Sequence, residues 1–390
     1  MSVVIASAVR TPIASFQSSF SPLKASELGA VAVKEAMARA GAEPSEVDLI
    51  LMGNVLPAGM GQAPARQAAI YAGLGEQVPS VTLNKMCGSG LEAVIQASRA
   101  VSALDAELVV AGGMESMTNA PYLIPGARGG LRMGPGELVD SMVHDGLWDV
   151  YNDKHMGSCA DMCAEKYHFD REAQDAFAVA SYERAQAATE DGIFAQEIVP
   201  VEVRGRKETV TVTEDEEPKR VKFDKLPKLR PAFSKDGTVT AANASTINDG
   251  AAALLVTSEA VAEARGLNIL ARIEGYSAHA QAPEWFTTAP VSAMQKLFDK
   301  LGWHPESVDL YEINEAFAVV PMAAMTEFDL PHDKVNVHGG AVALGHPIGA
   351  SGARILVTLL NALQTHGKTR GMASICIGGG EALALGVELV

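Results

Sequence analysis

Short apolar runs alternate with segments of helical periodicity along most of this chain. Apolar runs of strand length occur at residues 3–6, 251–256 and 308–313. Helical patterns occur at residues 31–39, 171–189 and 291–300, and Asp170 precedes the second of them as a candidate N-cap. This alternation predicts an α/β protein with a mixed or parallel sheet.

The order of these elements is repeated within the chain. Residues 40–49 (AGAEPSEVDL) are echoed by residues 301–310 (LGWHPESVDL), and each segment lies between a helical pattern and a strand. Further matches, in the same order, pair residues 89–90 with 351–352 and residues 110–113 with 377–380. Because the order is kept, we expect two similar α/β halves.

The stretch between the two copies has a different composition. Residues 125–130 are rich in glycine and proline, and an acidic run at 214–217 precedes six basic residues among positions 219–230. We expect this stretch to be an excursion inserted into the first half. The predicted domains are an N-terminal half at 1–120 with 248–268, a loop domain at 121–247 and a C-terminal half at 269–390.

Composition and charge exclude several classes of protein. A net charge of −16 opposes general nucleic-acid binding. Four cysteines in 390 residues argue against a disulfide scaffold and for a reducing compartment. The chain has no signal-peptide pattern at its start and no apolar run of the roughly 18–20 residues that span a membrane. We therefore expect a soluble cytoplasmic protein without a membrane partner.

Two cysteines lie at predicted junctions between a strand and a tight turn. Cys87 precedes Gly88 and a helical pattern, and Cys376 precedes Gly378 by two residues. Unpaired N–H groups at a helix start lower a thiol pKa, so Cys87 is a candidate nucleophile with a lowered pKa. The alternative is a buried, inert cysteine. The repeat aligns Cys87 near Gly349 and Cys376 near Ala111, so the two thiols are not equivalent copies.

A histidine, a second cysteine pair and the glycine-rich segments are further candidates for chemistry. His346 lies between Gly345 and Pro347 on a predicted loop, where a histidine is either structural or catalytic. Cys159 and Cys163 have helical spacing without a second ligand pair, which argues against zinc. The glycine-rich segments lack the strand–GxGxxG–helix arrangement of a dinucleotide site, and no Walker A sequence is present.

Four motifs in order resemble the thiolases: NKMCGSG at Cys87, NEAF at Asn314, GHPIGASG at His346 and CIGGG at Cys376. The similarity runs nearly end to end and implies the thiolase fold. That fold has two duplicated βαβαβαββ halves, each with a five-stranded mixed sheet, and an inserted loop domain. Residues 145–148 (DGLW) and 155–158 (HMGS) resemble the acetyl-CoA acetyltransferase branch, in which His155-Met156 narrows the acyl pocket.

The resemblance implies a role for each catalytic position. Cys87 is the nucleophile that carries the acetyl group, His346 is its base, and Cys376 is the acid/base that moves the α-proton of a second acetyl-CoA. One oxyanion is held by His346 and a water on Asn314. The other is held by the N–H groups of Cys87 and Gly378. The implied reaction is the reversible condensation of two acetyl-CoA to acetoacetyl-CoA and CoA.

The resemblance also assigns the CoA contacts. Adenine and phosphate contacts are expected at Lys219 or Arg220. Pantetheine-tunnel positions are Leu147, Phe233, Ala241, Ser245, Ile247, Ala316 and Phe317. Phe286 is expected near the substrate Cα, as in the branch that accepts 2-methylacetoacetyl-CoA. That branch binds potassium near Ala241, but Pro218 replaces its tyrosine, which argues against a metal here. CoA is substrate and product, so no cofactor is expected.

Two alternatives stay open at this point. One is a 3-ketoacyl-CoA thiolase of fatty-acid β-oxidation with broad chain-length specificity, which His155-Met156 disfavours. The other is a non-catalytic thiolase-like scaffold subunit, which would lose at least one of the four catalytic positions, whereas this chain keeps all four. Members of the family are homodimers or homotetramers, and the sequence does not choose between them.

Overall fold

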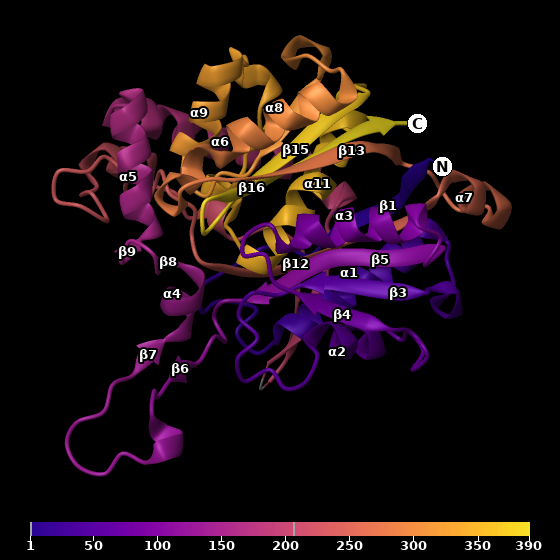
Figure 1. Cartoon of the computed structure of the whole chain (residues 1–390), viewed down its shortest axis with the longest axis horizontal. Coiled ribbons are helices and arrows are strands. Elements are labelled where there is room, and N and C mark those ends of the chain that lie inside the picture. Colours follow the sequence, from indigo (N-terminus) through magenta and orange to yellow (C-terminus); the bar gives the residue numbers. More distant parts are fainter. Residues whose placement is uncertain (1, 206) are drawn as a thin grey trace.

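Two α/β halves lie against each other in the computed structural model, which describes residues 2–205 and 207–390 (Figure 1). The elements of the first half are β1 (Val3–Arg10), β2 (Ala14–Ser15), α1 (Ala25–Ala40), β3 (Leu49–Gly53), α2 (Pro64–Tyr71), β4 (Ser80–Leu83), α3 (Ser89–Ser102), β5 (Leu108–Ser116) and β12 (Asn248–Ser258). Those of the second half are β13 (Ala271–Ala280), α8 (Ala289–Leu301), β14 (Leu310–Ile313), α9 (Val319–Phe328), α10 (Ala341–Leu344), α11 (Ile348–Thr365), β15 (Arg370–Ile377) and β16 (Glu381–Leu389). The short helix α7 (Glu259–Arg265) connects them.

The strands form one mixed sheet in the order β14-β15-β16-β13-β1-β12-β5-β3-β4. The first half contributes the five expected strands and follows the predicted βαβαβαββ order. The second half contributes four strands, with an isolated parallel bridge between Tyr311 and Val335 beside β14. Pairing of β1 with β13 joins the strands of the two halves into one sheet, whereas a five-stranded sheet was expected in each half.

The repeat is visible in the way that corresponding elements end. Gly41 ends α1 with a φ of 72°, and Gly302 ends α8 with a φ of 65°, a left-handed C-cap that favours glycine. After each cap, one aspartate accepts two backbone N–H bonds from the start of a later strand, which is β5 in the first half and β15 in the second. Asp48 binds residues 107 and 108, and Asp309 binds residues 369 and 370.

These paired aspartates correct one part of the predicted repeat. Leu108 corresponds to Arg370, so Met114 corresponds to Cys376, and the pairings of β3 with β5 and of β14 with β15 give the same register. The predicted match of residues 110–113 with 377–380, and of Cys376 with Ala111, is therefore wrong. The glycines that suggested it are not equivalent, because Gly112 and Gly113 lie within β5 whereas Gly378–Gly380 form the turn after β15.

Residues 121–247 contain the remaining elements. They are β6 (Tyr122–Leu123), β7 (Val139–Asp140), α4 (Ser141–Gly146), β8 (Trp148–Asp149), β9 (Lys154–His155), α5 (Met156–Tyr167), α6 (Arg171–Glu190), β10 (Val201–Arg204) and β11 (Thr209–Val212). The arm that carries β6 and β7 projects from the body (Figure 1). Asp170 caps α6 as predicted, its carboxylate accepting the Ala173 N–H at 2.7 Å. The domain limits at 120, 247 and 268 stay predictions.

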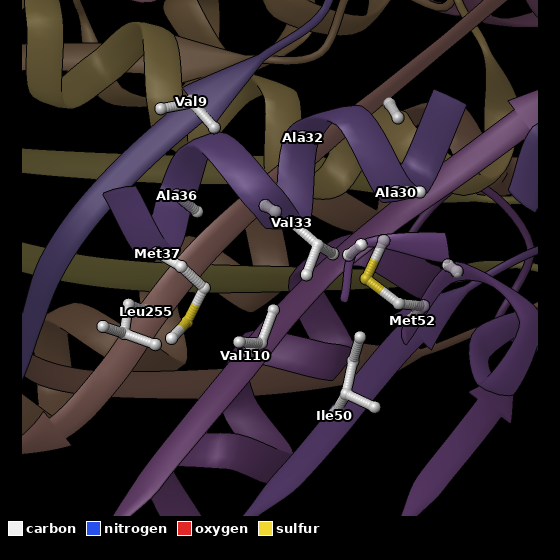
Figure 2. Close-up of a cluster of buried hydrophobic side chains, with 14 of the residues drawn as sticks. Val9, Ala30, Ala32, Val33, Ala36, Met37, Ile50, Met52, Val110 and Leu255 are labelled. Carbon is white, nitrogen blue, oxygen red and sulfur yellow. The ribbon is translucent and has the colours of Figure 1, made fainter. Parts of the chain in front are cut away.

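Apolar side chains fill the space between these layers. Helices α1 and α2 cover the outer face of the first half's sheet, and Figure 2 shows Val33 and Met37 of α1 over Ile50, Val110 and Leu255. Helices α3 and α11 pack against each other and share one apolar cluster with strands of both halves. Within the described residues, no helix is both long and apolar enough to cross a membrane.

Helices α3 and α11 touch through their backbones. A Cβ added to Gly90 would lie 2.6 Å from the Ala353 N, and one added to Gly352 would lie 2.5 Å from the Leu91 N. Real Cβ atoms do not approach backbone so closely, so both positions require glycine. The contact lies within the first turns of both helices, and it therefore sets where the residues that precede them are held.

Replacing Gly352 by alanine is predicted to destabilise the protein by about 1–3 kcal/mol, because the added methyl forces the two helices apart. Gly129→Ala is the matched control, since a Cβ there meets nothing within 4 Å. Urea denaturation of both variants measures the difference. Equal free energies of unfolding for Gly352→Ala and the wild type would contradict the tight crossing.

Candidate active site

A largely apolar cavity of about 210 Å³ opens at the starts of α3 and α11. Cys87 reaches it from the loop before α3, His346 from the loop before α11, and Gly378 from the turn between β15 and β16. The rest of the wall consists of Met117, Gly146, Leu147, His155, Met156, Phe233, Ala244, Ser245, Thr246, Ile247, Phe286, Ala316, Phe317 and Ile348. Segments far apart in sequence thus meet at one cavity.

Cys87 lies two residues before α3, after Met86, whose φ of 46° is unusual for a residue with a side chain. Burial raises the pKa of its thiol to about 11, although the N–H groups of Gly378 and of Cys87 itself act to lower it. The Glu115 carboxylate raises it further. The predicted lowered pKa is therefore wrong, because removal from water outweighs the donors at the helix start.

His346 is held by hydrogen bonds on its backbone and on one ring nitrogen. Its N–H donates to Asn248 Oδ1 at 3.0 Å, and its Nδ1 lies 2.6 Å from the Ser351 hydroxyl, which itself donates to Pro347 O. This network assigns a proton to Nδ1 and leaves the lone pair on Nε2. Burial, with the nearby Arg354 guanidinium, lowers the His346 pKa to about 3. The ring is neutral at pH 7 and can accept a proton.

Cys376 lies near the end of β15 and is fully buried. Burial raises the pKa of its thiol well above the ordinary value, and the Cys87 sulfur adds to the effect. The effect of Cys87 on this pKa indicates that the two sulfurs lie near each other, although Cys376 does not line the cavity. Once deprotonated, a thiol with so high a pKa is a strong base.

Asn314 follows β14 and is also buried. Its N–H donates to Ser374 O at 2.9 Å, and its Oδ1 faces the Arg354 guanidinium at 3.5 Å. No described residue accepts from its Nδ2. The Nδ2 N–H groups of Asn314 are therefore available to bind a water, which is the role that the resemblance implies.

The predicted CoA contacts divide into two sets. Those that line the cavity with Cys87 are Leu147, His155, Met156, Phe233, Ser245, Ile247, Phe286, Ala316 and Phe317. His155 stacks on Phe233 with ring centroids 4.7 Å apart, so two of these positions support each other. Those that do not line it are Lys219, Arg220 and Ala241. Lys219 pairs with Glu214, and Arg220 donates to the Ser18 hydroxyl at 3.2 Å. The role of each position stays a prediction.

Comparison with known proteins places this site in a family. The model of the thiolase N-terminal domain matches residues 3–260, and that of the thiolase C-terminal domain matches residues 267–389. The chain belongs to the thiolase family. It is 51% identical over 385 residues to an acetyl-CoA acetyltransferase of Pseudomonas aeruginosa, covering 98% of each chain. It is also 51% identical over 388 residues to one from Cupriavidus necator, covering 99% of each.

Solved structures confirm the thiolase fold. The acetyl-CoA acetyltransferase of Bacillus anthracis superposes with a TM-score of 0.97 at 40% identity, covering 100% of this chain and 99% of that one. The Acat5 thiolase of Ascaris suum, in complex with coenzyme A, superposes with a TM-score of 0.95 at 45% identity, covering 100% of both chains. The duplicated α/β architecture expected from the motifs is therefore correct.

Glu115 is a residue of this thiolase's site that the sequence analysis missed. Its carboxylate accepts hydrogen bonds from Asn54 Nδ2 at 2.7 Å and from the N–H groups of Val55 and Gly349, both at 2.9 Å. Burial raises its pKa to about 7. It ties the end of β3 to the start of α11, behind Cys87. A lone acid in the apolar run of β5 was the signal that could have revealed it.

The part of the chain that the structure describes brings no group of three or more histidine, cysteine or acidic side chains together where they could hold a metal ion. Cys159 and Cys163 are buried on α5, where burial raises the pKa of each thiol to about 11. Both lie in the apolar cluster that α5 shares with the second half.

The raised pKa of Cys87 predicts how it reacts with iodoacetamide. The thiolate fraction rises about tenfold per pH unit below the pKa, so the alkylation rate should rise steadily from pH 7 to 10. Peptide mapping with mass spectrometry assigns the label to Cys87. The control is a small-molecule thiol, whose alkylation rate levels off near pH 9. A plateau for Cys87 below pH 9 would show an activated thiolate instead.

Proposed function

We propose that this thiolase is an acetyl-CoA acetyltransferase that joins two acetyl-CoA into acetoacetyl-CoA and CoA. The observation that carries the proposal is the meeting of the Cys87 thiol, the neutral His346 ring and the Gly378 N–H at one apolar cavity. The relatives from P. aeruginosa and C. necator bear that name at 51% identity. All four catalytic positions are present, which argues against the scaffold alternative.

In the first step, His346 Nε2 takes the Cys87 proton as Sγ attacks the thioester carbonyl of acetyl-CoA. The N–H groups of Cys87 and Gly378 act to lower the pKa of this thiol and are the proposed donors to the oxyanion. The C–S bond to CoA then breaks. Cys376 gives its proton to the departing CoA thiolate, so the products are CoA, S-acetyl-Cys87, a Cys376 thiolate and a protonated His346.

In the second step, the Cys376 thiolate removes an α-proton from a second acetyl-CoA. Protonated His346 and the water on Asn314 stabilise the enolate oxygen, and the enolate carbon attacks the acetyl group on Cys87. The Cys87–acetyl bond breaks and Cys87 regains its proton from His346. The high pKa of Cys376 suits this step, because an α-proton beside a thioester is only weakly acidic.

Incubation with acetyl-CoA should add one acetyl group to the wild-type protein and none to Cys87→Ala. In Cys376→Ala, acetyl transfer to Cys87 should survive, because the CoA thiolate is a good leaving group that solvent can protonate in place of Cys376. Condensation should fall by about 10²–10⁴, because no other group is placed to remove the α-proton. Intact-protein mass spectrometry measures the first step and release of acetoacetyl-CoA the second. An acetyl group on Cys87→Ala, or an equal loss of both steps in Cys376→Ala, would overturn this division of roles.

Acetoacetyl-CoA is the proposed substrate for cleavage, in preference to longer 3-ketoacyl-CoA. Met156, Phe286 and Phe317 close the apolar wall of the cavity around Cys87. We expect 3-oxooctanoyl-CoA to be cleaved at least about 100-fold more slowly, because its chain would displace these side chains. Steady-state thiolysis with both substrates, and with 2-methylacetoacetyl-CoA, tests this. Comparable rates for the four- and eight-carbon substrates would instead indicate the broad β-oxidation type.

We also propose that the enzyme works as a homodimer or homotetramer in the cytoplasm. Support for assembly comes from the projecting arm, whose tip exposes 60% of Leu131 and 98% of Met133 to solvent. Such apolar exposure marks interaction surfaces. Four free cysteines support a reducing compartment. Acetyl-CoA, acetoacetyl-CoA and CoA are the proposed small-molecule partners.

A further inference from the structure

An ion pair joins the two loops that carry the thiols. Lys85 Nζ lies 2.5 Å from Glu381 Oε2, although the two residues are separated by 296 positions in sequence. Lys85 precedes Cys87 by two residues, and Glu381 opens β16 directly after the Gly378–Gly380 turn. The pair therefore bridges the first and second halves beside the reacting groups.

Backbone hydrogen bonds fix the positions of both residues of this ion pair. The Lys85 N–H donates to the Ser89 hydroxyl at 2.8 Å, and the Met86 N–H donates to Asn84 Oδ1 at 2.9 Å. On the other side, Glu381 pairs with Ile377 across β15 and β16. A shift of either charged side chain is thus passed to the Cys87 loop or to the Gly378 turn.

The distance between these loops matters for the chemistry. Cys87 on one loop and Gly378 on the other line the same cavity, the Gly378 N–H acts to lower the pKa of the Cys87 thiol, and Cys376 lies two residues before Gly378. The loops also fit closely, since a Cβ added to Gly88 would lie 2.4 Å from Ile377 Cδ1. A small change in their spacing would move the oxyanion donor and the second thiol away from Cys87 together.

We propose that Lys85 and Glu381 are positioning residues that clamp the Cys87 loop to the Gly378 turn for the acetyl-transfer reaction. The inference rests on the proposed function. The side chains are 25% and 38% exposed, so the pair contributes little to global stability and is screened by salt. The ion pair instead aligns the reacting groups, and a displacement of about 1 Å between such groups can cost 10²-fold in rate.

The test compares Lys85→Gln, Glu381→Gln and the charge-exchanged double variant K85E/E381K. Loss of either charge should lower kcat for acetoacetyl-CoA thiolysis by about tenfold with KM changed less than about twofold, and the exchanged pair should recover most of the loss. Glu259→Gln is the matched control, because Glu259 forms a 2.5 Å surface pair with Arg272 that joins no catalytic loop. It should keep the wild-type kcat.

Alkylation of Cys87 by iodoacetamide separates the clamp from a direct charge effect and needs no acetyl-CoA chemistry. Removing the negative charge of Glu381 would by itself favour the thiolate and speed alkylation. Loss of the clamp instead withdraws the Gly378 N–H and slows it. Slower alkylation of Glu381→Gln, restored in K85E/E381K, supports the proposal, and faster alkylation overturns it. If the wild-type enzyme cannot thiolyse acetoacetyl-CoA, the proposed function is refuted. The alkylation test still decides whether the clamp exists, because it does not depend on that reaction.

Discussion

The contact between α3 and α11 is the constraint on which the site depends. Gly90 and Gly352 bring the two helix backbones together, and a Cβ on Gly113 of β5 would lie 2.0 Å from Gly349 O at the start of α11. Such spacing leaves no room for side chains along the crossing. Because both helices begin at this contact, the residues that precede them, Cys87 and His346, face the same cavity. The catalytic geometry therefore follows from backbone packing.

The duplication produces two halves with the same backbone arrangement, and residue differences between the two halves produce the reactive groups of the site. Corresponding helices begin at the same cavity, yet the position equivalent to Cys87 in the second half is Gly349, whose N–H binds the Glu115 carboxylate. The strand position equivalent to Cys376 is Met114, a buried apolar residue. At one pair of equivalent positions, the first half has the proposed nucleophile Cys87 and the second half has a hydrogen-bonded glycine. At the other pair, the second half has the proposed acid/base Cys376 and the first half has an apolar packing residue. One site results from two like halves because their side chains diverged.

The sequence predicted the features that depend on local pattern and on motif. The two halves, the N-cap at Asp170 and nine of the positions along the cavity wall agree with the structure. Features that depend on tertiary surroundings were missed. The lowered pKa expected for Cys87 ignored its burial. Asp48 and Asp309 were matched correctly, but the following strand was aligned on its glycines and not on the N–H groups that bind these aspartates. Lys219 and Arg220 form surface contacts in a loop whose register a charge pattern does not determine.

The electrostatics of the cavity disfavour proton transfer from Cys87 to His346 until substrate is bound. Burial keeps Cys87 as a neutral thiol and His346 as a neutral ring, so the substrate-free site carries neither a Cys87 thiolate nor a His346 imidazolium. A proton transfer between them creates two charges in an apolar cavity, which is unfavourable unless an oxyanion forms at the same time. In the proposed mechanism, the thioester carbonyl provides that oxyanion, and the N–H groups of Cys87 and Gly378 stabilise it. The thiol becomes strongly nucleophilic only as the bond to substrate forms, which limits its reaction with other electrophiles.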